Sequence, residues 1–240
     1  MTVSPIRSVT ELLSGNSYPG RGIVTGKSPD GKNAVIAYFI MGRSENSRNR
    51  VFVETGDGLQ TAPFGAGKVK DPSLILYTAV RPVKNCLIVT NGDHTDTVAE
   101  GLEKGLSPEE ALAGRTFEPD APNYTPRISS VLAFGNEDFA YRMSILKSLD
   151  GGGVYAVRNH FCFDSVPGLG HLIHTYECDG NPLPSFCGEP RSISVPDSID
   201  AFAEEVWNAL DADNRISLYV RYTDMETRRF ERRLINKNQK

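Results

Sequence analysis

The sequence has few of the features that mark a secreted, membrane-spanning or metal-binding protein. It holds only four cysteines, none in a CxxC pair or at a short metal-ligand spacing, so we expect reduced thiols that pack as small hydrophobic side chains. No run approaches the roughly 20 apolar residues that span a bilayer. The first 15 residues lack the continuous apolar stretch of a signal peptide. These absences favour a cytoplasmic protein without a membrane partner.

An excess of positive charge is also missing. The 26 lysines and arginines are outnumbered by 30 acidic residues, giving a net charge of -4, so nucleic acid is not a predicted partner. Hydrophobic residues make up 39% of the 240 positions, which suffices for a sizeable core at this length. No repeat, low-complexity tract or linker interrupts the chain, and we expect a single domain over residues 1–240.

Most of the chain has the pattern of short strands separated by turns. Residues 21–27 and 33–41 flank the turn Ser28-Pro-Asp-Gly31 and predict a hairpin. Further strands are predicted at 50–55, 73–80, 85–90, 128–134, 139–149, 154–163, 171–178 and 216–222. Because parallel βαβ alternation is absent, the pattern indicates an α+β protein with mostly antiparallel sheets.

Helices are fewer. One is predicted over 95–104. A second is predicted from Ser107, where Glu110 completes a capping box and Pro108 occupies the first helical position. A third is predicted over 198–210. Its apolar residues recur every three or four positions and form one stripe: Ile199, Phe202, Val206 and Leu210.

Four segments carry more polar, turn-forming and charged residues than a scaffold needs. They cover residues 18–22, 42–50, 91–97 and 118–127. The third ends a strand and opens a helix, an arrangement whose backbone N–H groups bind anions or carbonyls. An equally physical alternative is that Thr95 or Asp96 merely caps the helix and that His94 is bonded within the loop. The arginines of these segments are candidates for phosphate, or ordinary surface residues.

Taken in order, these segments resemble the archaeal-type IMP cyclohydrolase family. The most specific part is the string Asn-Gly-x-His-Thr-Asp-Thr. The positions that carry the resemblance are Tyr18, Gly20, Arg21, Arg43, Ser44, Asn49, Arg50, Tyr77, Thr90 to Thr97, and Thr125 to Ile128, with a weaker echo at Ile173 to Glu177.

The resemblance implies a four-layer αββα sandwich like that of N-terminal-nucleophile hydrolases, without the self-processed nucleophile. Thr2, which loss of Met1 would expose, lies well before the first clear strand. The implied reaction is dehydrative closure of 5-formamidoimidazole-4-carboxamide ribonucleotide to inosine monophosphate. The expected partner is therefore a small purine nucleotide, with no cofactor and no metal. Whether the chain forms a homo-oligomer is left open.

Motif positions imply a catalytic trio of Arg50, Tyr77 and Glu118. We hypothesise that Arg50 stabilises the developing oxyanion and lowers the pKa of Tyr77, which exchanges protons with the substrate while Glu118 assists. Asp120 competes with Glu118, and Arg48 competes with Arg50 because the first loop is longer than the family form. The implied substrate-binding residues are Arg21, Arg43, Ser44, Asn91, Gly92, His94, Thr95, Asp96 and Arg127.

Two other functions stay open at the level of sequence. One is a hydrolase that opens a different cyclic amide on the same scaffold, and the other is a non-catalytic nucleotide sensor. Residues 1–17 and 179–191 have no placed counterpart in the family, which leaves room for an altered substrate. The basic tail over 228–240 is interpreted as an edge strand protected by charge.

Overall fold

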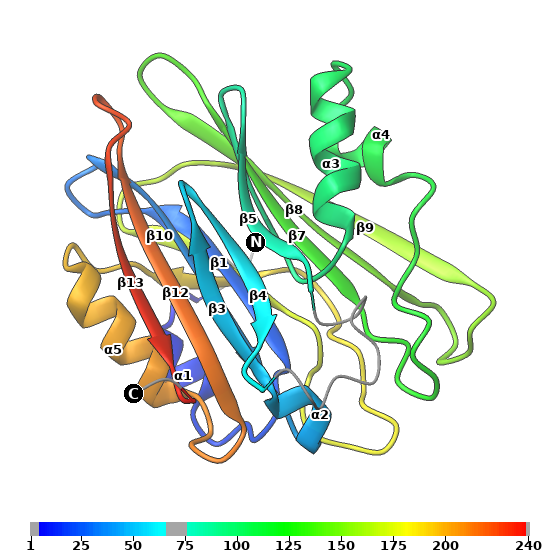
Figure 1. Cartoon of the computed structure of the whole chain (residues 1–240). Helices are drawn as coiled ribbons and strands as arrows, with labels where there is room; N and C mark the ends of the chain where they lie inside the picture. Colours follow the sequence, from blue (N-terminus) through cyan, green and yellow to red (C-terminus); the bar gives the residue numbers. More distant parts are fainter. Residues whose placement is uncertain (1–4, 66–75, 239–240) are drawn as a thin grey trace.

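Two antiparallel β-sheets stacked face to face form the centre of the computed structural model, which describes residues 5–65 and 76–238. The six-stranded sheet has the order β11-β10-β1-β2-β12-β13, and the seven-stranded sheet runs in sequence order from β3 to β9. Figure 1 shows α1 and α5 on the outer side of one sheet and α3 and α4 on the outer side of the other. The protein is thus of the predicted α+β class, with few helices.

The six-stranded sheet is built around the predicted hairpin. Its strands are β1 (Arg21–Lys27), β2 (Asn33–Met41), β10 (Leu169–His174), β11 (Arg191–Ser194), β12 (Arg215–Asp224) and β13 (Phe230–Asn236). At the hairpin turn, Asn33 N donates to Ser28 Oγ at 2.9 Å, and Gly31 takes a φ of 75°. Glycine adopts that left-handed conformation without a steric penalty.

The seven-stranded sheet is a meander apart from the insertion of α3 and α4 after β6. Its strands are β3 (Arg50–Thr55), β4 (Gly58–Pro63), β5 (Thr78–Val83), β6 (Cys86–Thr90), β7 (Arg127–Phe134), β8 (Phe139–Ser148) and β9 (Ala156–Asp164). Each strand pairs with its neighbour in sequence. Because β6 and β7 are antiparallel, the last residues of β6 and the first residues of β7 lie side by side at the same end of the sheet.

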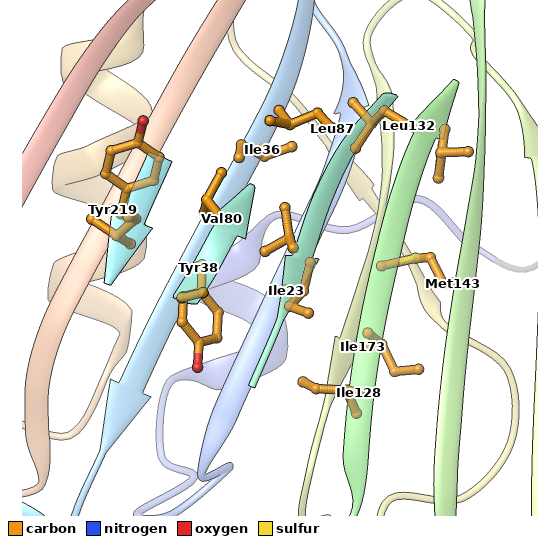
Figure 2. Close-up of a cluster of buried hydrophobic side chains, with 14 of the residues drawn as sticks. Ile23, Ile36, Tyr38, Val80, Leu87, Ile128, Leu132, Met143, Ile173 and Tyr219 are labelled. Carbon is orange, nitrogen blue, oxygen red and sulfur yellow. The ribbon is translucent and has the colours of Figure 1, made fainter. Parts of the chain in front are cut away.

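Side chains from both sheets fill the space between the layers. Ile23 of β1 lies in the core between the sheets, whereas its neighbour Val24 packs against α1 and α5. The two sides alternate because successive side chains point to opposite faces of a strand. Figure 2 shows the inter-sheet core with residues of both sheets, among them Ile36, Leu87 and Met143. β2 is buried along nearly its whole length, which explains its continuous apolar run.

Five helices complete the described part of the chain. They are α1 (Val9–Leu13), α2 (Glu45–Arg48), α3 (His94–Glu103), α4 (Pro108–Leu112) and α5 (Ile199–Ala209). The capping box at Ser107 is confirmed, since its side chain accepts from Glu110 N. None of these helices is long and apolar enough to cross a membrane.

Several predicted elements need correction. The helix predicted over 95–104 spans His94–Glu103, and its N-cap is Asp93, so the alternative in which Thr95 or Asp96 caps the helix is wrong. Strand β5 begins at Thr78, later than predicted, and residues 73–75 and Thr2 lie outside the described residues. Strand β10 ends at His174 rather than residue 178. Short elements were missed, namely α1, α2, β4 and β11, because four to six residues carry too little periodicity.

Phe202 is a sensitive position of the outer core, because its side chain is 0% exposed beneath α5. We expect Phe202→Ala to lower the free energy of unfolding by about 3–5 kcal/mol, through lost burial and a residual cavity. The exposed Glu204 on the same helix serves as the control, and Glu204→Ala should stay within about 0.5 kcal/mol. Urea unfolding followed by circular dichroism measures both. Equal losses would contradict this account of α5 packing.

Candidate active site

Strand starts and strand ends from both sheets meet at one end of the sandwich. In the seven-stranded sheet, Arg50 opens β3 and Arg127 opens β7, while Tyr77 directly precedes β5. In the six-stranded sheet, Arg21 opens β1. The two sheets are joined at this end by a hydrogen bond of 2.7 Å between the hydroxyl groups of Tyr38 and Tyr77. Residues far apart in sequence are therefore brought into one cluster.

Close packing of the Tyr18-to-Arg21 segment fixes Arg21. Gly20 has a φ of 81°, and a Cβ on it would lie 2.2 Å from Thr175 Oγ1. Only glycine fits this position. Arg21 N donates to the same Thr175 hydroxyl at 3.1 Å, and Thr175 N donates back to Arg21 O at 2.9 Å. The weak sequence echo around Thr175 thus lies directly beside Arg21.

Arg50 is the most deeply buried charged residue of the site, with 2% of its surface exposed. Its Nε donates to Ser47 O at 2.9 Å. Its Nη2 is buried and finds no acceptor within residues 5–65 and 76–238, and the same holds for Arg21 Nε. Burial, followed by the like charge of Arg21, lowers the pKa of Arg50. Buried donors without an acceptor typically cost about 1–3 kcal/mol each, so both groups favour an incoming acceptor.

Arg48 does not take the place of Arg50. Its Nε donates to Gly42 O at 3.0 Å and its Nη2 donates to Asn214 at 3.0 Å. These bonds tie Arg48 to the loop and to the start of β12, outside the cluster.

Tyr77 lies between the two sheets with 7% of its surface exposed. Its backbone is held by Thr61, whose hydroxyl accepts from Tyr77 N at 3.1 Å. Burial raises the pKa of the Tyr77 phenol, while the Arg50 and Arg21 guanidinium groups act in the opposite direction with less effect. The expected lowering by Arg50 is therefore outweighed, and Tyr77 is a neutral phenol near neutral pH.

Glu118 brings a carboxyl group into this cationic cluster. Burial raises the pKa of Glu118 to about 7, and the charges of Arg21 and Arg127 offset only part of that rise. The competing Asp120 is committed to a turn instead, because its carboxylate accepts from both the backbone N–H and the hydroxyl of Thr125. Of the two acids, Glu118 is the one that faces the arginines.

Gly92 permits the approach of three functional side chains. A Cβ at this position would lie 2.7 Å from Arg127 Nη1, 3.3 Å from His94 Nδ1 and 3.4 Å from Glu118 Oε1. Arg127 is 7% exposed and pairs with Asp93. Asp93 also accepts from Arg115 at 2.6 Å. The Asp93 carboxylate therefore holds Arg127 in place.

The rest of the Asn91-to-Thr97 string supports the site without facing it. Asn91 donates to Pro126 O at 2.9 Å and accepts from Ile128 N at 2.8 Å, which clamps β6 to the start of β7. Its amide is therefore engaged in the scaffold, contrary to the expected substrate contact. Asp96 is exposed and pairs with Arg81, away from the cluster.

His94 and Thr95 are both buried, and the His94 ring lies beside the Arg127 guanidinium group. Burial, and then the charge of Arg127, lowers the pKa of His94 to about 3, so the imidazole is neutral. One of its nitrogens is 3.1 Å from Ile128 O. The Thr95 hydroxyl donates to Thr78 O, next to Tyr77. Both residues fix the positions of site residues rather than presenting free polar groups.

Arg43 and Ser44 lie at the border of the site. Arg43 stacks over the Tyr18 ring at 4.9 Å, pairs with Asp179 and donates to Gly180 O at 2.9 Å. Ser44 caps α2 by accepting from Ser47 N at 3.1 Å. The segment after Cys178, which had no family counterpart, is thus tied to the site through Arg43.

Sequence reasoning missed two tyrosines of the site. Tyr176 stacks on Tyr18 with ring centroids 5.9 Å apart, and its hydroxyl lies 2.6 Å from Thr125 Oγ1. Tyr38 bonds Tyr77, but its position in an apolar run is typical of core packing. Only the weak echo around Tyr176 gave a signal in the sequence.

Comparison with known proteins places the chain in a family. A family model described as IMP cyclohydrolase-like protein matches residues 18–227. An IMP cyclohydrolase of Methanococcus aeolicus is 33% identical over 168 residues, which cover 67% of this chain and 75% of that protein. The IMP cyclohydrolase of Methanopyrus kandleri is 31% identical over 184 residues, covering 70% and 89%. The one of Halobacterium salinarum is 34% identical over 120 residues, covering 48% and 57%. Because the family model and the two methanogen relatives each span most of its length, the chain belongs to the IMP cyclohydrolase-like protein family.

Proposed function

We propose that this protein is an IMP cyclohydrolase, which closes the six-membered ring of inosine monophosphate from 5-formamidoimidazole-4-carboxamide ribonucleotide with release of water. The observation that carries the proposal is a pair of buried arginine donors, Arg21 Nε and Arg50 Nη2, which have no acceptor among the described residues and lie beside Tyr77 and Glu118. A substrate oxygen that becomes negatively charged during the reaction would supply the acceptor. The named relatives support the same reaction.

The reaction needs orientation and proton transfer. The carboxamide nitrogen attacks the formyl carbon, a C–N bond forms, and the formyl oxygen becomes an oxyanion. That oxygen takes up two protons, which balance one proton lost by the carboxamide nitrogen and one lost by the formamide nitrogen, and it leaves as water when its bond to the formyl carbon breaks. Pre-orientation of two reacting groups can remove about 7–11 kcal/mol of a barrier. A rigid cluster at the ends of packed strands is suited to that task.

Arg50 is assigned to the oxyanion. Its Nε is fixed by Ser47 O, which leaves Nη2 as a preoriented donor. Arg21 adds a second positive charge, strong enough to be a leading influence on the pKa of Arg50. A donor that is already in place needs no reorganisation as charge develops.

Tyr77 and Glu118 are assigned complementary proton roles. The neutral Tyr77 phenol donates a proton to the departing oxygen. Glu118, with a pKa of about 7, is close to half ionised at neutral pH and accepts the proton of the attacking carboxamide. A phenol that stays protonated and a carboxyl group that ionises near neutral pH match the acid and the base that this reaction needs.

Arg127 and Arg43 are assigned to the ribose and phosphate. Each is held by a carboxylate of the chain, Arg127 by Asp93 and Arg43 by Asp179. The planar guanidinium group recognises phosphate oxygens through paired N–H donors. The assignment of Asn91, Thr95 and Asp96 to substrate contact is not retained, since their side chains bond elsewhere.

The N-terminal-nucleophile-hydrolase type of fold belongs to the same proposal. Its support is the stacking of two antiparallel sheets between helical layers (Figure 1). A cyclic-amide hydrolase of another substrate is the less favoured alternative, because the named relatives share one reaction. A non-catalytic sensor would have no need for a carboxyl group with a pKa near neutrality beside a buried phenol.

The function is tested by incubating the purified chain with the formamido-imidazole nucleotide and following inosine monophosphate by absorbance. Turnover supports the cyclohydrolase. Tight binding of inosine monophosphate by calorimetry without turnover would replace it with the sensor, and neither activity nor binding would reject both.

Conservative arginine changes separate the catalytic donor from its neighbour in sequence. We expect Arg50→Lys to lower kcat by about 10²–10³, because lysine keeps the charge but loses the preoriented donor. Arg48→Lys, which changes a loop contact, should leave kcat within about threefold. Tyr77→Phe should lower kcat by about 10²–10⁴ through loss of the proton donor. Full turnover by both Arg50→Lys and Tyr77→Phe would refute the assignment.

The raised pKa of Glu118 predicts a pH profile. Since the carboxylate is the active form, kcat/KM should rise with pH through about pH 7. Glu118→Gln should abolish this rise together with most of the activity. Asp120→Asn should keep it and move it to lower pH, because the negative charge of Asp120 raises the pKa of Glu118.

The same residue makes a prediction for stability that needs no assay. A carboxyl group whose pKa is higher in the folded state binds more protons there than in the unfolded state. Its contribution to the free energy of unfolding therefore falls as pH rises from about 4.5 to about 7, and is constant above that. Urea unfolding of Glu118→Gln between pH 5 and pH 8 should show a weaker decline than the native chain. An unchanged slope would place the titrating group elsewhere.

A further inference from the structure

Tyr38 is a buried phenol whose hydroxyl enters the site from the opposite sheet. The residue is 0% exposed and its ring stacks on Phe52 with centroids 5.2 Å apart. Figure 2 shows it within the apolar cluster between the sheets. A hydroxyl group in such surroundings is costly unless it is hydrogen-bonded. The partner that the structure gives it is the Tyr77 hydroxyl at 2.7 Å.

The direction of this bond follows from the neighbours of each phenol. Among the described residues, Tyr38 has a single hydrogen-bond partner for its hydroxyl, so its proton is satisfied only if Tyr38 donates. Tyr77 has other polar groups within electrostatic reach, namely Arg50, Arg21 and Glu118. Donation by Tyr38 therefore leaves the Tyr77 proton free for the reaction.

We infer that Tyr38 is a positioning residue, which donates its hydroxyl proton to the Tyr77 oxygen and thereby directs the Tyr77 proton toward the substrate. The inference rests on the proposed function, in which Tyr77 is the proton donor. In this inference Tyr38 contributes to the reaction through Tyr77 and does not contact the substrate. It also explains why a tyrosine occupies this place in the apolar run of β2, where phenylalanine would fill the same volume.

The bond has a second consequence for catalysis. A hydrogen bond donated to the Tyr77 oxygen stabilises the phenolate that forms when Tyr77 gives up its proton. This agrees with the direction of the pKa effects, since the bond raises the pKa of Tyr38 and lowers that of Tyr77. Burial alone would leave Tyr77 a poorer acid.

The kinetic test compares Tyr38→Phe with a matched control. Tyr141 is equally buried, at 1% exposure, and its hydroxyl bonds His171. That histidine pairs with Thr25, four residues along β1 from Arg21. We expect Tyr38→Phe to lower kcat about tenfold with KM within twofold, because one hydrogen bond to a developing phenolate is lost. Tyr141→Phe should leave both constants unchanged. Unchanged kcat in Tyr38→Phe would overturn the inference.

A spectroscopic test separates this inference from the function itself. Difluorotyrosine, a more acidic phenol, is placed at position 77, and its ionisation is followed by ¹⁹F NMR with and without Tyr38→Phe. Loss of the donor should raise the titration midpoint by about one pH unit. If the native chain had no cyclohydrolase activity, the proposed function would fail. The titration midpoint at position 77 would still show whether Tyr38 donates a hydrogen bond to this phenol. An unshifted midpoint would overturn the inference.

A second variant covers the case in which Tyr38→Phe does not fold. Fluorotyrosine at position 38 keeps the ring and the hydroxyl but is a stronger donor. It should move the Tyr77 midpoint to lower pH, and an unmoved midpoint again counts against Tyr38.

Discussion

Burial of opposite charges at the meeting point of two sheets is the constraint on which the site depends. Arg50, Arg127 and Glu118 are buried together beside the half-buried Arg21, so they lose much of the hydration that charged groups have in water. Moving such groups out of water costs several kcal/mol each, and their mutual attraction returns only part of it. The cluster persists because the two sheets are locked by the apolar core between them and by the cores under the helices. The stability of the sandwich thus sustains a site that is unfavourable in itself.

The same burial creates the chemical difference between Tyr77 and Glu118. Loss of hydration disfavours the charged form of each, so both pKa values rise. For the phenol, a rise from 10 keeps a proton ready to donate at any pH near neutrality. For the Glu118 carboxyl group, a pKa of about 7 means that a large share is ionised at neutral pH, and this buried carboxylate can accept a proton. One physical cause therefore yields an acid and a base, and the neighbouring arginines limit how far either shift goes.

Much of the fold could be predicted from the sequence, because local patterns determine it. The hairpin of β1 and β2 follows from two apolar runs around a Pro-Asp-Gly turn, and the helix after Ser107 follows from its capping box. The elements that escaped prediction were short, or lay where the chain leaves a strand to pack against a distant segment. Strand β10 is an example, since beyond His174 the backbone turns to bond Pro19. That contact joins residues more than 150 positions apart.

The sequence by itself determined which family the chain resembles, and through that resemblance it indicated an arginine, a tyrosine and a glutamate as candidates for the site. Only the tertiary structure decided their partners. Asn91 and Asp96 belong to the most specific motif, yet their side chains bond the start of β7 and Arg81. Tyr38 had the pattern of a core residue, yet its hydroxyl reaches Tyr77 on the other sheet. Hydrogen bonds form only between groups that the fold brings within about 3 Å of each other. The positions of two residues in the sequence do not show whether the fold brings them that close.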